Sequence, residues 1–115
     1  MEFPSENDFL QKFGVKPIEV DQSLALCRYK VKSKNGDLEL DLSFSAVMRS
    51  FQVELRMAMH ELAIISSEGV RSIEIVEDGS EAGVRVVFDI CGSTSEAMVT
   101  FEPELKCRWF TLSAM

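Results

Sequence analysis

The stretch CRYKVKSKNGDLELDLSF, residues 27–44, constrains the fold more than any other part of the chain. Asn35-Gly36 is a favoured pair for a two-residue type I′ hairpin turn, because both turn positions need a positive φ. One face of the hairpin then pairs opposite charges and the other pairs apolar side chains, as in an antiparallel sheet that packs on one side. The predicted pairs are Lys34 with Asp37, Lys32 with Glu39, Lys30 with Asp41, Val31 with Leu40, Tyr29 with Leu42 and Cys27 with Phe44.

A second hairpin is predicted in VRSIEIVEDGSEAGVRVVFDI, around Asp78-Gly79. Its first half places Ile73 and Ile75 on one side, and its second half alternates cleanly, with apolar residues at Val84, Val86, Phe88 and Ile90. The next segment, AMVTFEPELKCRWFTL, is interrupted by Pro103, which cannot donate to a ladder. Two short strands therefore flank the proline, or one edge strand bends there.

Residues 51–62, FQVELRMAMHEL, fit both a helix and a strand. Helix propensity is high, because Met, Arg, Gln, Glu, Leu and Ala dominate. A strand, however, places all the large apolar residues from Phe51 to Met59 on one side, and strand signals lie before and after the segment. We therefore favour a strand that turns at His60-Glu61, although this is an unusual pair for a turn.

The N-terminal segment SENDFLQKFG predicts a short helix that Ser5 caps and Gly14 ends. Phe9, Leu10 and Phe13 would form its buried stripe. The whole pattern predicts an α+β fold that is mostly β: a twisted antiparallel sheet of about six to eight strands with one short N-terminal helix. We expect residues 1–115 to form a single domain, given the usual size of domains.

Acidic residues are concentrated in one part of the chain. Residues 1–60 hold nine acids and eight bases, whereas residues 61–104 hold ten acids and two bases, within a net charge of −7. Such a surface repels phosphates, which disfavours nucleic acid as a partner and is complementary to a basic protein. Solubility alone is the other explanation for this charge.

No motif for catalysis, a cofactor or a metal ion stands out. The single histidine, His60, has a poor orienting partner in Glu61, and the cysteines Cys27, Cys91 and Cys107 lack metal-ligand spacing. We therefore expect no enzyme activity, no cofactor and no metal site, and three buried, reduced thiols. Met48, Met57 and Met59 fit either a core or an adaptable binding groove, and either Trp109 or Phe110 faces away from the main core unless both faces are covered.

The N-terminus MEFPSENDFL is acidic and lacks the basic and apolar regions of a secretory signal. No apolar run approaches the roughly 18 residues that span a bilayer. We therefore expect a soluble, cytoplasmic protein with no membrane partner.

The segments SSEGVRSIEI, GVRVVFDI and VTFEPELKCRWFTL resemble the C-terminal half of small bacterial immunity proteins from polymorphic-toxin and contact-dependent growth inhibition systems. The resemblance covers roughly residues 50–113, reflects strand packing, and also favours strands at SFQVELRM and LAIISSEGV. It implies that the chain neutralises a cognate toxin domain, often a nuclease, by binding it.

Together with the charge, this role predicts that the acidic segment forms the toxin-binding face. The candidate contact residues are Glu74, Glu77, Asp78, Glu81, Glu102, Glu104 and, as an anchor, Trp109. The alternatives are a structural or adaptor domain that forms homodimers through an edge strand, and a small-ligand-binding β-barrel.

Overall fold

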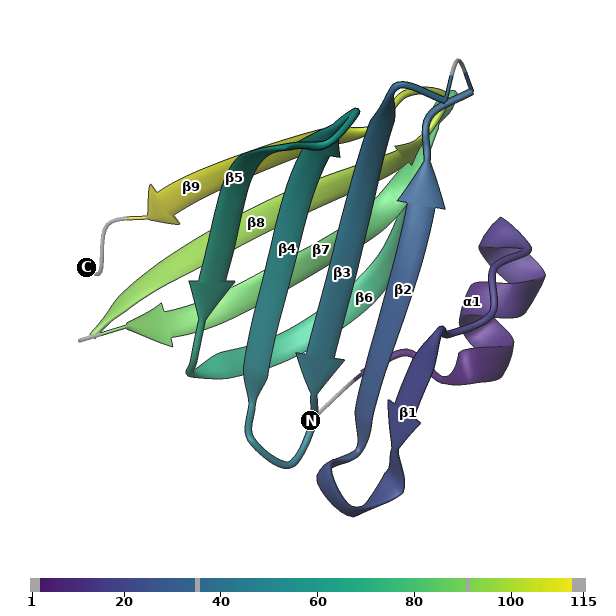
Figure 1. The fold of residues 1–115 in the computed structure, drawn as a ribbon. Helices are drawn as coiled ribbons and strands as arrows, with labels where there is room; N and C mark the ends of the chain where they lie inside the picture. Colours follow the sequence, from purple (N-terminus) through teal and green to yellow (C-terminus); the bar gives the residue numbers. More distant parts are fainter. Residues whose placement is uncertain (1–2, 35, 91, 113–115) are drawn as a thin grey trace.

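The computed structural model describes residues 3–34, 36–90 and 92–112, which form one α-helix and nine strands (Figure 1). The elements in chain order are α1 (Glu6–Phe13), β1 (Glu19–Asp21), the short 3₁₀ turn η1 (Gln22–Leu24), β2 (Leu26–Lys32), β3 (Leu38–Ser45), β4 (Ser50–Met57), β5 (His60–Ser67), β6 (Val70–Asp78), β7 (Glu81–Ile90), β8 (Ser93–Glu102) and β9 (Lys106–Leu112).

The strands form two antiparallel sheets that pack face to face. Sheet 1 has the order β1-β2-β3-β4-β5, and sheet 2 has the order β6-β7-β8-β9. The predicted class, α+β and mostly β, is confirmed. The described strands number nine rather than six to eight, and they lie in two separate sheets rather than in one sheet or a closed barrel.

The hairpin of β2 and β3 has the predicted register. Cys27, Tyr29, Val31, Lys30 and Lys32 all lie opposite the expected residues of β3. The amide of Gly36, at φ +80°, donates to the carbonyl oxygen of Ser33. Asn35 lies outside the described residues, so the predicted turn type stays a prediction. Lys34 and Asp37 are described, but the ladder between β2 and β3 ends at Lys32 and Glu39 and does not pair them.

The ambiguous segment 51–62 is a strand, as expected, and belongs to the hairpin of β4 and β5. The predicted turn position is wrong: Met57 pairs with His60, so the turn lies at Ala58-Met59, with Ala58 at φ +56°. His60 and Glu61 therefore begin β5 instead of linking two strands. Phe51 and Val53 are buried, whereas Met57 and Met59 extend past the core and are exposed.

The second predicted hairpin corresponds to β6 and β7, in which Asp78 pairs with Glu81 across a two-residue turn. Val84, Val86 and Phe88 are buried as expected, while the side chain of Ile90 lies outside the described part of the chain. Two strands flank Pro103, as in the first of the two predicted arrangements, although β8 is ten residues long.

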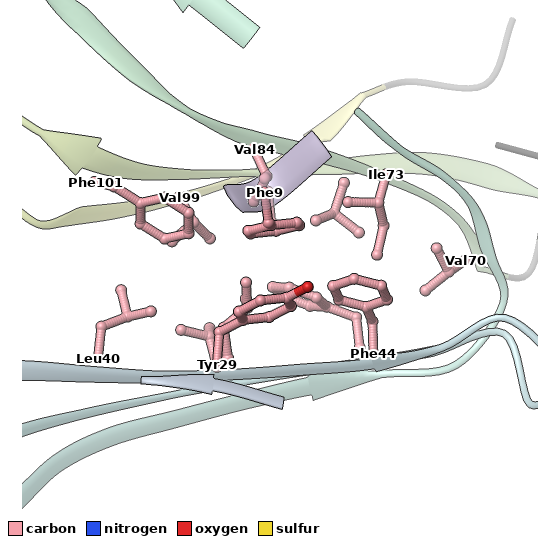
Figure 2. Close-up of a cluster of buried hydrophobic side chains, with 14 of the residues drawn as sticks. Phe9, Tyr29, Leu40, Phe44, Val70, Ile73, Val84, Val99 and Phe101 are labelled. Carbon is pink, nitrogen blue, oxygen red and sulfur yellow. The ribbon is translucent and has the colours of Figure 1, made fainter. Parts of the chain in front are cut away.

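The helix α1 closes one side of the sandwich. Ser5 and Asp8 form a reciprocal capping box at its start, and Gly14 ends it in the left-handed conformation. Phe9 is 1% exposed and stacks on Tyr29 of sheet 1, with ring centroids 4.1 Å apart. Figure 2 shows the Phe9 ring among side chains of both sheets, above Tyr29. The predicted burial of Leu10 is wrong, because this side chain is 41% exposed.

The core between the sheets is apolar and aromatic. Inward side chains of β2, β3 and β4 face those of β6, β7 and β8 (Figure 2). The largest fully buried side chains are Tyr29, Phe9, Phe51, Phe88, Leu40, Leu42, Ile73, Val53, Val70, Val84, Val86 and Val99. Within the described ranges, no helix is long and apolar enough to cross a membrane.

Candidate protein-binding surface

Five of the seven predicted contact residues lie together at one end of sheet 2. Across the β6–β7 hairpin, Asp78 pairs with Glu81, and Ala82 lies between Glu77 on one side and Glu102 on the other. Glu104 follows in the connection from β8 to β9. We call this set, Glu77, Asp78, Glu81, Glu102 and Glu104, the acidic end. In Figure 1, β8 ends toward the upper right, at the same end of the sandwich as the β2–β3 turn.

Two members of the acidic end are neutralised by lysines. Glu77 forms an ion pair with Lys12 of α1, and Glu81 forms one with Lys106 of β9. The hydrogen bond from Lys106 lowers the pKa of Glu81. Asp78, Glu102 and Glu104 are exposed and have no ion-pair partner within the described ranges, so they carry the uncompensated charge of this end.

Glu74 lies apart from the acidic end, on the outer face of sheet 2. It is opposite Arg85 in the ladder and forms an ion pair with this residue. Arg85 also approaches Glu96, with Nε and Oε1 3.6 Å apart. The charge of Glu74 is therefore largely balanced within the sheet.

Trp109 faces the core. Its ring stacks on Phe88 with centroids 4.8 Å apart, and the side chain is half-buried. The next residue, Phe110, points to the outer face of sheet 2, where it lies opposite Glu96 and is 46% exposed. The alternation of β9 thus exposes Phe110, the other aromatic of the pair, and places Trp109 in a packing position.

The acidic segment 61–104 does not form a single face, because it runs through both sheets. Residues 19–67, which include all of sheet 1, hold seven acids and six bases. Residues 70–112, which include all of sheet 2, hold eight acids and four bases. The negative excess therefore belongs mainly to sheet 2.

The outer face of sheet 1 carries a polar network that sequence reasoning missed. The guanidinium of Arg28 donates twice to Asp41, from Nε at 2.9 Å and from Nη2 at 2.6 Å. Asp41 lies opposite Glu54, which accepts a hydrogen bond from Nε of Arg56 at 2.7 Å. Both carboxylates are buried beneath these longer side chains. The sequence signal for this network would have been the position of Glu54 beside Asp41. That position follows only from the register of β4 on β3.

The Arg28–Asp41 pair predicts a pH dependence of stability. The hydrogen bonds from Arg28 hold the pKa of Asp41 below its ordinary value of 3.8. The stabilisation is therefore complete above pH 3.8 and is lost as the pH falls through the lower pKa of the folded state. We expect Asp41→Asn to lower the free energy of unfolding by about 1–2 kcal/mol at neutral pH, since Arg28 is partly exposed and can rehydrate.

Urea unfolding from pH 7 to pH 2.5 measures this effect, with the exposed Asp78→Asn as the matched control. The difference between Asp41→Asn and the unmodified chain should shrink below pH 4, and Asp78→Asn should change little at any pH. A deficit for Asp41→Asn that stays constant down to pH 2.5 would contradict the role of the ionised pair.

Few side chains of the described residues suit catalysis or metal binding. His60 is exposed at the start of β5, and no group of three or more His, Cys, Asp or Glu within the described ranges is placed to hold a metal ion. Cys27 and Cys107 are free thiols and are half-buried rather than fully buried as expected. Cys91 lies outside the described residues.

A shallow groove of about 520 Å³ joins the acidic end to the β4–β5 turn. Its lining includes Leu38 and Met57 from sheet 1 and Pro103, Glu104 and Leu105 from the β8–β9 connection. Leu105 is buried, whereas Met57 is exposed. The groove thus places apolar surface beside Glu104, and the charged residues Lys34 and Asp37 also line it.

No protein-family model matches the sequence, and no curated protein matches it. Among solved structures, the chain is similar to one in the "Contact-dependent growth inhibition toxin - immunity protein complex from Klebsiella pneumoniae 342", with a TM-score of 0.87. The two chains are 22% identical, and the match covers 96% of each. A likeness at this level of identity establishes a shared fold. The solved complex comes from the same kind of system as the immunity proteins that the sequence resembles.

Proposed function

We propose that this chain is an immunity protein that binds a cognate toxin domain and neutralises it. The observation that carries the proposal is the shared fold, over 96% of both chains, with a chain of a contact-dependent growth inhibition toxin–immunity protein complex. That likeness alone does not distinguish inhibitor from toxin. The resemblance of residues 50–113 to immunity proteins favours the inhibitor.

The proposed mechanism is steric and electrostatic blockade of a nuclease. A nuclease needs a basic surface where it meets phosphates, and an acidic protein can occupy that surface. Asp78, Glu102 and Glu104 at the acidic end have uncompensated charge for this purpose, and Phe110 is the exposed aromatic of sheet 2. On this proposal the chain acts by covering its partner and performs no bond chemistry of its own.

Co-expression tests the proposal. Candidate toxin domains from contact-dependent growth inhibition systems are co-expressed with the chain one at a time, and both cell survival and co-purification are scored. We expect survival and a stable complex with one such domain, and neither with a toxin domain from an unrelated system. Growth arrest caused by the chain alone would identify it as a toxin and overturn the proposal.

Charge reversal tests the acidic end. Asp78→Lys with Glu104→Lys changes the net charge from −7 to about −3 and should slow association with the toxin domain about tenfold at low salt, because steering is lost. The same variant should flatten the salt dependence of the association rate. Stopped-flow or surface-binding kinetics at several salt concentrations measure both effects.

The matched control places the same charge change at the far end of the molecule. Glu6→Lys with Glu19→Lys also reaches a net charge of about −3, but both residues are exposed on α1 and β1, away from the acidic end. Its association rate should fall less than about threefold. Equal slowing by both double variants would show that net charge matters and that the acidic end does not.

A further inference from the structure

The four sheet edges differ in how they are protected against pairing with another strand. At one edge of sheet 1, β1 has only three residues. In sheet 2, α1 lies beside β6, where Lys12 pairs with Glu77, and β9 carries Lys106 and Arg108. Short strands, covering elements and basic side chains are all devices that discourage edge pairing.

The β5 edge has little such protection. Its eight residues, HELAIISS, pair only with β4 in the described sheets, and they include neither lysine nor arginine nor proline. One irregularity occurs at Leu62, which is extra in the ladder because Leu55 pairs with Ala63 and Arg56 with Glu61. From Ala63 to Ser67 the pairing with β4 is regular, so alternate residues of this stretch direct their backbone N–H and C=O groups away from β4, toward an open edge.

Exposed apolar side chains are concentrated at this edge. Leu62 is 55% exposed, Ile64 is 49% exposed, and Met59 in the preceding turn is 95% exposed. Met57 lies on the core-facing side of β4 and lines the groove with Leu105 and Glu104, whereas Ile64 lies opposite Glu54 on the outer face of sheet 1.

The charge of the β5 edge determines which kind of strand can pair with it. The segment from His60 to Glu68 holds two carboxylates, Glu61 and Glu68, and no lysine or arginine; Arg56 of β4 lies opposite Glu61, whereas Glu68 follows the strand. A second copy of this chain would bring four carboxylates to one seam between two molecules that each carry −7. Like charges across adjacent strands are destabilising, whereas a strand with lysine or arginine would be attracted.

We propose that an extended, basic segment of the toxin partner adds to sheet 1 as a sixth strand along β5. Main-chain hydrogen bonds to the open edge supply the pairing, and apolar side chains of the segment pack on Leu62, Ile64 and Met59. The identity of the partner rests on the proposed function, but the open edge and its charge do not.

Hydrogen–deuterium exchange of the complex with the toxin domain that the co-expression experiment identifies tests the inference. The alternate amides within Ala63–Ser67 that face away from β4 should exchange about tenfold or more slowly in the complex, because strand addition gives them hydrogen-bond acceptors. Amides of the β9 edge, Lys106–Leu112, provide the internal control and should not change. Tight binding with unchanged exchange in β5 would overturn the inference and leave the proposed function standing.

Two other outcomes would overturn the inference. Failure of the toxin domain to bind or to be neutralised would remove both the proposed function and this inference. Protection of β5 in the free chain that grows with concentration, together with a dimeric mass, would identify a second copy as the occupant and overturn the inference.

A variant pair gives an independent measurement. Ile64→Lys places a cation on the open edge and should raise the Kd for the toxin domain about thirtyfold or more. Val47→Lys makes the same change at a similarly exposed apolar residue in the β3–β4 turn and should raise the Kd less than about threefold. Circular dichroism confirms that both variants fold, and equal Kd values for the two would count against strand addition at β5.

Discussion

Phe9→Ala should lower the free energy of unfolding by about 3–5 kcal/mol, the usual range for removing a fully buried phenylalanine. Phe9 is 1% exposed and stacks on Tyr29, and it also contacts Phe44 and Phe101, whose ring centroids lie 6.0 and 6.4 Å away. Its ring thus joins both sheets to α1, and no neighbouring side chain of the helix can replace it. Thermal and urea unfolding measure the loss.

The control lies one residue further along the same helix. Leu10 is 41% exposed, so Leu10→Ala removes a side chain of similar class without opening the core, and should change stability by less than about 0.5 kcal/mol. A loss below about 1 kcal/mol for Phe9→Ala would mean that the two sheets hold together without the helix.

Gly83→Ala should be the other severely destabilising change, at about 2–4 kcal/mol, because the added methyl group has no space. A Cβ atom at Gly83 would lie 2.0 Å from the carbonyl oxygen of Val99 and 2.8 Å from Cα of Thr100, both in the backbone of β8. Backbone atoms of a paired strand cannot move aside as a flexible side chain can, so β7 and β8 must separate locally.

Gly79→Ala measures the cost of an unfavourable backbone conformation alone, without steric overlap. Gly79 lies in the β6–β7 turn at φ +62°, and a Cβ atom there would meet no other atom within 4 Å. The expected cost is therefore only the left-handed strain of an L-residue, about 1 kcal/mol. Urea unfolding of both variants should show the larger loss for Gly83→Ala, and the reverse order would contradict close packing of β7 on β8.

Local pairings were predictable because a turn and its flanking residues determine them. The β2–β3 register follows from Asn35-Gly36 and from charges that match on one face, and the cap residues Ser5 and Gly14 mark both ends of α1. The segment 51–62 was harder, because its residues suit a helix and only the alternation with its neighbours indicated strand. Its turn was misplaced because Ala58-Met59 carries no turn signal; the left-handed Ala58 is tolerated there.

Longer-range features could not be read from the chain in the same way. Alternating strands bury the same residues whether they form one covered sheet or two packed sheets. The sequence therefore carries no pattern that marks the division between β5 and β6. Which of Trp109 and Phe110 faces the core depends on the register of β9 on β8. This register is set after the bend at Pro103. Of the acids predicted for the candidate site, those that lie together are brought there by one hairpin, its neighbouring strand and the connection that follows it.

The Arg28–Asp41 interaction shows why register alone does not identify ion pairs. Lys30 lies directly opposite Asp41, as predicted, yet Asp41 accepts its hydrogen bonds from Arg28, which lies opposite Ser43, two pairs further along the ladder. A planar guanidinium can donate twice to one carboxylate, whereas an ammonium acts as a point charge. Geometry within the folded sheet therefore selects the partner.

The strictly sequential strand order has a consequence for how the chain assembles. Within each sheet, every strand pairs with the next one along the sequence, so either sheet can form strand by strand by closing only short loops. The ring of Phe9 is different, because its neighbour Phe101 arrives only with the eighth strand. During synthesis, α1 can therefore pack against both sheets only after nearly the whole polypeptide has left the ribosome.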